Sequence, residues 1–201
     1  MKLYYSPGAC SLSAHIALLE SGLPYDLVKV DVRAKKTENG DDFLRINGKG
    51  QVPALALDEG TVLTECPVIV QVIADMVPEL SLAPAQDSAE RYRLQEWLNF
   101  ITSELHKNFN PMFSPVLPEE TKMFFKDRIT AKFKYVDGTL AEKEYLMGEQ
   151  FSVADGYLFT MLTWADRLKV DVLQFPNLAA YKTRVAARPK VKEALKKEGL
   201  I

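Results

Sequence analysis

A cysteine near the start of the chain stands where a thiol can become reactive. Cys10 follows the turn-forming run Ser6-Pro7-Gly8 and directly precedes a stretch with helical spacing. A thiol at the first turn of a helix meets the positive end of the helix dipole, which lowers its pKa and favours the thiolate. Ser13 occupies the position three residues on, so a self-contained dithiol motif is absent. The alternative interpretation of Cys10 is a small buried apolar side chain.

Residues 51–65 have the features of a segment that holds a small peptide by its main chain. Residues 54–63 predict a hairpin, and Pro53 stands at its entrance. An X-Pro bond there is a candidate for the cis form, which would expose the backbone of Val52 to an extended ligand. Glu65 begins the next predicted helix, whose free N–H groups favour a carboxylate. A plain hairpin with a rigid entry is the alternative.

Three polar residues share one face of a long predicted helix. Asn99, Ser103 and His106 are spaced i, i+4 and i+7. A polar stripe with one of only two histidines can line a cleft, where His106 can donate or accept a proton near neutral pH. A solvated face that ends in a capping histidine is the alternative, and on local grounds it is the one we favour.

A helix start is predicted at the run Ser152-Val153-Ala154-Asp155. A serine followed three residues later by an acid is a capping box, here with aspartate in the usual place of glutamate. We interpret Ser152 and Asp155 as structural, fixing the start of a buried helix.

The elements that position these residues change in character along the chain. The first part predicts short strands at 2–5 and 25–30, helices at 11–21 and 65–77, and the hairpin, with a short helix at 41–47. Strands mixed with helices in this order predict a small mixed sheet with helices packed on it. After residues 81–84, which we interpret as a linker, no convincing strand follows. The predicted helices are 88–108, 118–141, 152–168, 176–187 and 189–199. We therefore predict an α/β domain at 1–80 and an all-helical domain at 87–201.

Composition excludes several classes of function. The 201 residues are 47% hydrophobic and 26% charged with a net charge of −2, typical of a globular protein without the basic surface of a nucleic-acid binder. The apolar runs are too short to span a bilayer, and a strand-like segment begins directly after Met1 without room for a signal peptide. Two cysteines suit a reducing compartment, so we expect a cytoplasmic protein.

Together these residues resemble the bacterial beta-class glutathione transferases over essentially the whole chain. The motifs that carry the resemblance are Tyr5-Ser6-Pro7-Gly8-Ala9-Cys10-Ser11, Asn39-Gly40-Asp41-Asp42, Gly50-Gln51-Val52-Pro53-Ala54-Leu55, Leu63-Thr64-Glu65, Glu96-Trp97-Leu98-Asn99-Phe100, Glu104-Leu105-His106-Lys107 and Phe151-Ser152-Val153-Ala154-Asp155. The resemblance implies a thioredoxin-like N-terminal domain with a mixed four-stranded sheet, a helical C-terminal domain and a homodimer. It implies glutathione as co-substrate, and we expect no cofactor and no metal.

The resemblance also implies roles for individual residues. Cys10 would face the glutathione sulfur, with His106 as a second catalytic residue. Val52, before a cis Pro53, would pair with the cysteinyl backbone of glutathione. The other residues expected at the glutathione site are Lys35, Gln51, Glu65, Cys66, Asn99, Ser103 and Glu104.

Position 66 departs from the family pattern. Cys66 stands where a serine or glycine is more usual, so a weak thiol replaces a hydroxyl donor. We expect the second thiol to weaken glutathione binding or to provide an oxidation site. Cys66 is also a candidate N-cap before Pro67, and cysteine is a poor cap.

The resemblance implies conjugation of the glutathione thiolate to a small apolar electrophile. We expect the electrophile to lie against Phe109, Met112 and Phe113, because methionine and phenylalanine give adaptable apolar walls. Two other functions stay open. One is a glutathione-dependent thiol–disulfide oxidoreductase or peroxidase acting through Cys10, and the other is a non-catalytic scaffold that binds glutathione or other ligands.

Overall fold

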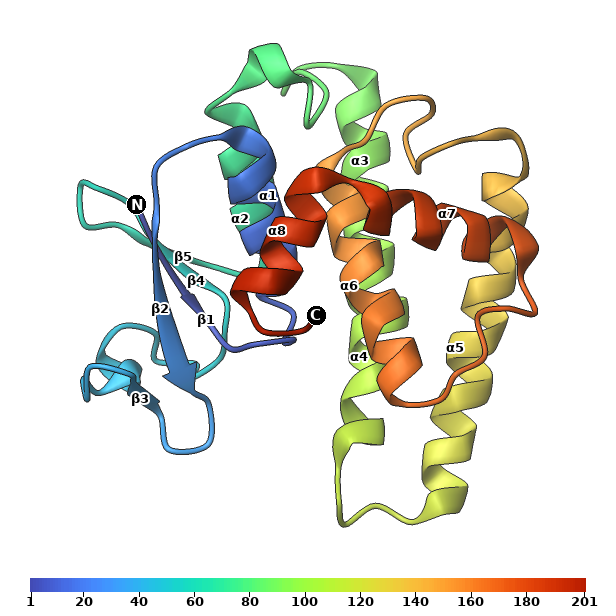
Figure 1. Cartoon of the computed structure of the whole chain (residues 1–201), viewed down its shortest axis with the longest axis horizontal. Coiled ribbons are helices and arrows are strands. Elements are labelled where there is room, and N and C mark those ends of the chain that lie inside the picture. Colours follow the sequence, from blue (N-terminus) through green and yellow to red (C-terminus); the bar gives the residue numbers. More distant parts are fainter.

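The first part of the chain forms a sheet with helices against one face (Figure 1). The computed structural model describes all of residues 1–201. Its first elements are β1 (Lys2–Tyr5), α1 (Leu12–Ser21), β2 (Asp26–Asp31), β3 (Lys36–Thr37), η1 (Phe43–Arg45), β4 (Ala54–Ala56), β5 (Val62–Thr64), α2 (Cys66–Asp75) and η2 (Pro78–Leu80). The strand order is β3-β2-β1-β4-β5, with β1 and β2 parallel and the other neighbours antiparallel. The mixed thioredoxin-like architecture is therefore confirmed.

The sheet has five strands, which corrects the expectation of four. The additional strand, β3, is two residues long and pairs with the end of β2 through Thr37 opposite Val30 and Lys36 opposite Asp31. A segment this short shows no alternation of apolar and polar residues, because alternation needs at least four residues to be recognised. From the sequence pattern alone, this segment is therefore predicted as a loop.

The predicted hairpin is present and its entrance has the predicted geometry. Leu55 in β4 faces Leu63 in β5, and Ala54 also pairs with Tyr4 in the central strand β1. The peptide bond between Val52 and Pro53 is cis. The backbone of Val52 thus lies just outside the sheet, at the edge of the turn that leads into β4.

The rest of the chain is helical. Its elements are α3 (Ala89–Phe100), η3 (Ile101–His106), α4 (Lys107–Phe109), η4 (Asn110–Phe113), α5 (Glu119–Thr139), η5 (Leu140–Glu142), α6 (Val153–Arg167), α7 (Pro176–Ala187) and α8 (Pro189–Lys197). The run from α3 to α4 is one continuous rod in which η3 is a π-helix, with wider turns than an α-helix.

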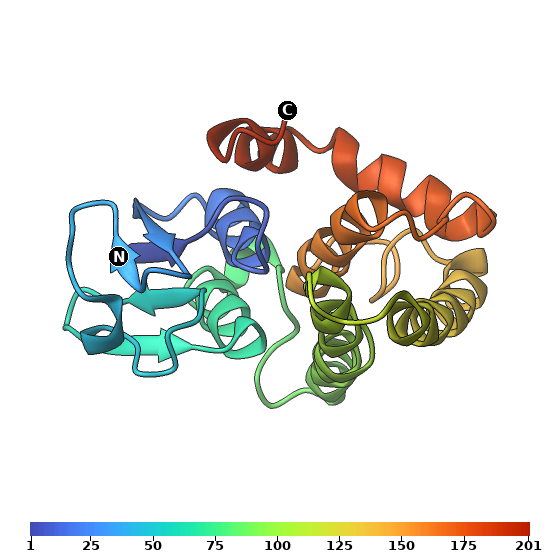
Figure 2. The ribbon, with the colours of Figure 1, turned by 90° about the horizontal axis from the view of Figure 1, so that it is seen from below.

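α1 and α2 lie between the sheet and the C-terminal helices (Figures 1 and 2). α1 packs against α6 and α8, and α2 packs against α3 and α6. One apolar core of 46 residues therefore runs from the sheet through α1 and α2 into the helical part, whereas the opposite face of the sheet has a cluster of six. The same core includes residues from both sides of the segment 80–87. The division into two domains at this segment therefore stays a prediction.

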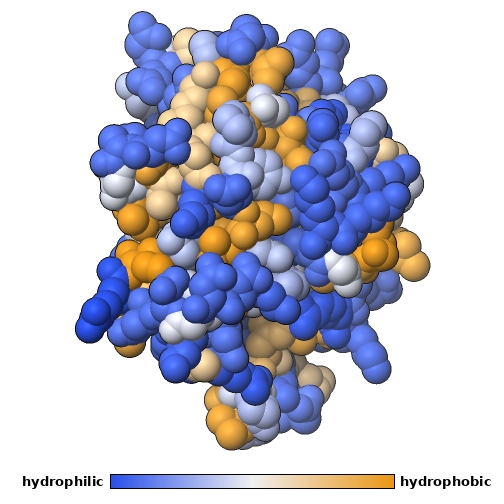
Figure 3. Space-filling view, turned by 60° about the vertical axis from the view of Figure 1, so that its left-hand side comes forward, coloured by the Kyte–Doolittle hydropathy of each residue, from blue (hydrophilic) through white to orange (hydrophobic).

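Hydrophilic side chains cover most of the face shown in Figure 3, and apolar side chains gather there only in small patches. The burial of apolar side chains in the two core clusters follows from the hydrophobic effect. Single apolar side chains that remain exposed on the surface are normal. None of the helices combines the length and the apolar character needed to span a membrane.

Candidate active site

Cys10 lies at the end of the loop that joins β1 to α1. Ser11 closes this loop, because its buried hydroxyl accepts from the Ser6 N–H and donates to the Ser6 carbonyl, both at 3.2 Å. The Cys10 side chain is half-buried, and in its protonated form its thiol donates to the carbonyl oxygen of Val52 at 3.1 Å. The thiol and the backbone before the cis peptide bond, far apart in the sequence, are thus direct neighbours.

The C-terminal helices hold the same loop in place. The Gly8 N–H donates to Glu198 Oε2 at 2.8 Å, and Trp164 Nε1 donates to the Gly8 carbonyl at 2.8 Å. Gly8 has a φ of +67°, and a Cβ there would stand 3.2 Å from Leu200 and 3.3 Å from Arg167. Glycine is therefore required both for the backbone conformation and for the close approach of the C-terminus.

His15, the second histidine, supports this arrangement from inside α1. Its Nδ1 donates to Glu198 Oε1 at 2.9 Å, and its Nε2 accepts from the Tyr25 hydroxyl at 3.1 Å. The side chains of His15 and Glu198 are both fully buried. A buried charged group needs such partners, so this network fixes α8 against the loop that carries Cys10.

The surroundings of Cys10 favour its thiolate. A hydrogen bond from the Cys66 thiol is the largest effect, and with His106 it lowers the pKa of Cys10 well below its ordinary value despite burial. The same pairing, together with burial, raises the pKa of Cys66. The sequence assigned this effect to the helix dipole alone, and the structure adds Cys66 as the largest influence and His106 as a further one. Near neutral pH the pair therefore consists of one thiolate and one thiol.

A tyrosine orients His106 toward the thiols. The Tyr157 hydroxyl lies 2.7 Å from His106 Nδ1, and the Thr102 hydroxyl donates to Tyr157 at 3.4 Å. When Tyr157 donates to Nδ1, the ring carries its proton on Nε2, which leaves that N–H free to donate to Cys10. Trp164 packs edge-on against the imidazole with ring centroids 5.0 Å apart. Tyr157 and Trp164 thus hold the ring in one orientation.

A pocket of about 340 Å³ opens around these residues, within the usual range for small-molecule sites. Eight of the predicted site residues line it: Cys10, Lys35, Gln51, Val52, Pro53, Glu65, Cys66 and His106. The helical part contributes Thr102, His106, Lys107, Asn110, Tyr157 and Trp164. The pocket therefore lies between the edge of the sheet and the helices.

Charged groups are distributed along the sheet side of the pocket. Lys35 Nζ donates to the Gly50 carbonyl at 2.8 Å, and Lys49 Nζ pairs with Glu65 Oε1 at 2.5 Å. Lys35 and Glu65 have φ values of +57° and +72°, which non-glycine residues seldom adopt. Such backbone conformations concentrate at ligand sites, where the surrounding structure enforces them.

Three predicted glutathione-site residues lie outside the pocket. Asn99 and Ser103 are exposed, and Glu104 forms an ion pair with Lys132 of α5 at 2.8 Å. The i, i+4, i+7 stripe assumes α-helical turns, whereas η3 is a π-helix. Its wider turns rotate His106 away from the other two residues of the stripe. The polar face is therefore split, with only His106 directed at Cys10.

Most of the residues predicted to form the apolar wall of the electrophile site also lie outside this pocket. Phe109 is fully buried against Trp164 and Phe133, and Met112 is 8% exposed in the same core. Neither lines the pocket, which corrects their assignment to the electrophile site. Phe113 is 39% exposed and packs edge-on against Trp164 with centroids 5.1 Å apart. Of the three, only Phe113 stays a candidate, because its neighbour Trp164 does line the pocket.

Glu65, not Cys66, is the N-cap of α2. Cys66 is already the first helical residue, and Pro67 follows within the first turn. The positive φ of Glu65 places it outside the helix, and the proline's missing N–H is tolerated in the first turn. The expectation of a cysteine cap was wrong by one residue.

The predicted capping box is present at the start of α6. The fully buried Asp155 carboxylate accepts from the Ser152 N–H at 2.7 Å and the Ser152 hydroxyl at 2.8 Å. It also accepts from the Leu146 N–H and the Tyr181 hydroxyl, each at 2.9 Å. Burial raises the pKa of Asp155 even with these donors. The box therefore ties α6 to the preceding loop and to α7.

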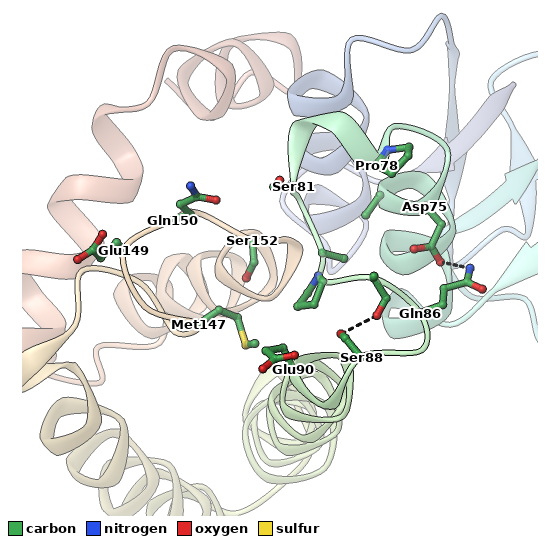
Figure 4. A pocket seen from close by; sticks show the side chains of 14 residues that line it. Asp75, Pro78, Ser81, Gln86, Ser88, Glu90, Met147, Glu149, Gln150 and Ser152 are labelled. Carbon is green, nitrogen blue, oxygen red and sulfur yellow. Dashed lines mark hydrogen bonds between the residues drawn. The ribbon is translucent and has the colours of Figure 1, made fainter.

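A larger pocket of about 860 Å³ lies elsewhere, between the end of α2, the linker and the loop before α6 (Figure 4). It contains no cysteine and no histidine. The Asp75 carboxylate in this pocket already accepts hydrogen bonds from Gln86 and from Arg91, whose Nη2 contacts both carboxylate oxygens. We therefore assign the chemistry to the smaller pocket, where the thiols and the histidine are.

Twelve of the 20 residues that line the pocket were not predicted as site residues, among them Lys49, Thr102, Tyr157 and Trp164. Tyr157 and Trp164 stand seven residues apart, and such spacing places them on one face of a helix. Two aromatic residues with polar tips on an otherwise apolar helix are a signal that could have been used. Lys49 sits in a glycine-flanked loop and carries no such signal.

Comparison with known proteins gives a consistent result. Two family models match the chain: the glutathione S-transferase N-terminal domain over residues 8–76 and the C-terminal domain over residues 100–189. The glutathione S-transferase GstA of Escherichia coli O157:H7 is 48% identical over 200 residues, and the match covers 100% of both chains.

Solved structures agree over the same length. A sphingomonad glutathione S-transferase complexed with glutathione superimposes with a TM-score of 0.97 at 47% identity, covering 100% of both chains. The bacterial beta class glutathione S-transferase of Sphingomonas chungbukensis also gives a TM-score of 0.97, at 49% identity and the same coverage. The chain therefore belongs to the glutathione S-transferase family, in its bacterial beta class.

Proposed function

We propose that this protein joins the thiolate of glutathione to small apolar electrophiles in the pocket around Cys10. The observation that carries the proposal is the match between this pocket and a short peptide with two carboxylates, one amine and one thiol. Lys35 and Lys49 supply cations, Glu65 supplies an anion, and Val52 supplies a backbone beside the Cys10 sulfur. The sphingomonad relative, solved with glutathione, supports the same occupant.

The thiolate of glutathione is the reacting form, so the site must stabilise a negative sulfur near neutral pH. The Nε2–H of His106 and the start of α1 are the donors available for this task. One pKa unit of stabilisation corresponds to about 1.4 kcal/mol. The site also lowers the reaction barrier by holding the electrophile beside the bound thiolate in the orientation that the reaction needs.

We place the apolar electrophile on the helical side of the pocket. Trp164 lines the pocket there, and the half-exposed Phe113 packs against it. Aromatic faces provide a large apolar contact with few directional demands, which suits varied substrates.

Thiol–disulfide exchange is the second candidate, and the lowered pKa of Cys10 favours it. A thiolate that faces the glutathione sulfur can form a mixed disulfide with it. Peroxide reduction through the same thiol belongs to this class. Conjugation and exchange use different electrophiles, so one site can perform both.

A homodimer in the cytoplasm is the expected state. Trp97, Phe100 and Tyr135 form an aromatic cluster with centroids 5.5 to 6.1 Å apart, and Tyr135 is 59% exposed. Exposed aromatic groups of this kind mark interfaces. Two free thiols suit a reducing compartment. The molar mass in solution and cell fractionation test these two statements.

A panel of glutathione-dependent reactions tests the function. We expect turnover of an aryl halide or an epoxide, because these electrophiles need only a bound thiolate and an apolar wall. Turnover of a small disulfide or a hydroperoxide would add the exchange activity of Cys10. If glutathione binds but none of the four substrates reacts, the protein is a binding scaffold and the proposal is wrong.

A further inference from the structure

Both cysteines of the chain meet in the pocket, although they stand 56 residues apart. Cys66 is 4% exposed, and its thiol donates to the carbonyl oxygen of Cys10 at 3.6 Å. Neither cysteine is in a disulfide. The second thiol is thus packed directly on the residue that carries the first.

The two side chains also interact with each other. The Cys66 thiol lowers the pKa of Cys10, and Cys10 together with burial raises the pKa of Cys66. A disulfide requires the sulfur atoms to close to about 2.05 Å, and the Cys66 sulfur already lies 3.6 Å from the backbone carbonyl oxygen of Cys10. The first turn of α2 carries Cys66. It therefore places a second thiol beside any disulfide that Cys10 forms.

Apart from lowering the pKa of Cys10, the Cys66 thiol has no evident task in the pocket. A hydroxyl would serve a glutathione carboxylate better than a weak thiol donor does. The position also lacks the thiolate character that would make Cys66 itself the attacking group, because its partner Cys10 holds the negative charge. A buried thiol beside a reactive thiolate has the arrangement of a resolving cysteine.

We propose that Cys66 is the resolving thiol of Cys10, and that the pair cycles between a dithiol and an intramolecular disulfide. The proposal deepens the exchange activity above and rests on the entry of glutathione into this pocket. First, the Cys10 thiolate attacks oxidised glutathione, forming a Cys10–glutathione disulfide and releasing one glutathione thiolate. Next, Cys66 attacks the Cys10 sulfur, and its proton goes to the second glutathione as that leaves.

The electrons balance over the two steps. The protein dithiol loses two electrons and becomes a disulfide, and oxidised glutathione gains them as two reduced glutathione molecules. The reverse sequence, in which reduced glutathione attacks the protein disulfide, restores the dithiol. In the disulfide form Cys10 no longer offers a thiolate to a ligand, so the cycle also controls the exchange activity of the site.

Intact mass under non-reducing conditions tests the proposal. The reduced protein and the C66S variant are each treated with oxidised glutathione and quenched with acid. We expect the unaltered protein to lose the mass of two hydrogen atoms, and C66S to gain the mass of one glutathione on Cys10. A stable glutathione adduct on the unaltered protein, equal to that of C66S, would overturn the proposal.

A second oxidant separates this proposal from the function of the pocket. Diamide oxidises thiols without a glutathione site, and we expect it to cross-link Cys10 and Cys66, identified by peptide mapping. No cross-link with diamide overturns the resolving role, whatever glutathione does. A cross-link with diamide but no reaction with oxidised glutathione supports the dithiol pair and counts against the glutathione site. Thermal unfolding of C66S, matched to the unaltered protein, verifies that the variant is folded.

Discussion

Replacing Cys10 with alanine will reduce glutathione-dependent disulfide reduction by at least about a hundredfold, because the substitution removes the nucleophile itself. Conjugation of an aryl halide will fall by about tenfold or less, since the attacking sulfur there belongs to glutathione. The N–H of His106 remains to stabilise that sulfur. The measurement is kcat/KM for both reactions in the same preparation.

The Cys10→Ser variant is the matched control. It restores a polar side chain near the Val52 carbonyl, which accepts from the thiol at 3.1 Å, but it supplies no thiolate. We expect the serine variant to resemble alanine in disulfide reduction. Undiminished disulfide reduction by either variant would show that Cys10 is not the nucleophile.

Replacing Asp155 with alanine will destabilise the protein by about 3–5 kcal/mol, the largest effect on stability that we expect. The substitution leaves buried donors of Ser152, Leu146 and Tyr181 without an acceptor. It also detaches the start of α6, the helix that carries Tyr157 and Trp164 into the pocket. The free energy of unfolding from denaturant titration measures the effect.

Ser152→Ala provides the comparison for this prediction. It removes one hydroxyl that donates to Asp155 and leaves the carboxylate with its other donors, so we expect a cost of about 1 kcal/mol. If the alanine variant at Asp155 is no less stable than the one at Ser152, the carboxylate does not hold this part of the fold together.

Local patterns were sufficient to predict most elements of the fold. β1 occupies residues 2–5 and α7 occupies residues 176–187, both as predicted, and Gly22 ends α1 in a left-handed conformation. The two helices carry strong local signals, a proline in the first turn of α7 and a glycine after the last residue of α1. The two-residue β3 has no such signal, because its pairing depends on β2 and not on its own residues.

The sheet side of the site was more predictable than the helical side. Cys10 and Val52 are positioned by turns whose residues show in the sequence, and the cis bond before Pro53 follows from the same motif. On the helical side, the π-helical turn of η3 brings Thr102 and His106 together and leaves Ser103 exposed. A pattern of polar residues does not distinguish α-helical from π-helical turns.

The thiol pair shows the same limit. The sequence identified Cys66 as a departure from the family pattern but not as the main influence on Cys10. That influence depends on the contact of the first turn of α2 with the β1–α1 loop, which unites residues 56 positions apart. Contacts of this range follow from the assembled fold and not from local spacing.

The central claim is that glutathione binds with its sulfur beside a reactive Cys10, and protection of Cys10 from alkylation tests it most directly. Because the pKa of Cys10 is lowered, the thiolate is present at neutral pH and is lost only on acidification through the lowered value. Iodoacetamide should therefore modify Cys10 at neutral pH, and mass mapping distinguishes Cys10 from Cys66. S-methylglutathione at about ten times its Kd should slow this modification about tenfold. An unchanged rate, at a concentration that calorimetry shows to fill the protein, would contradict the account.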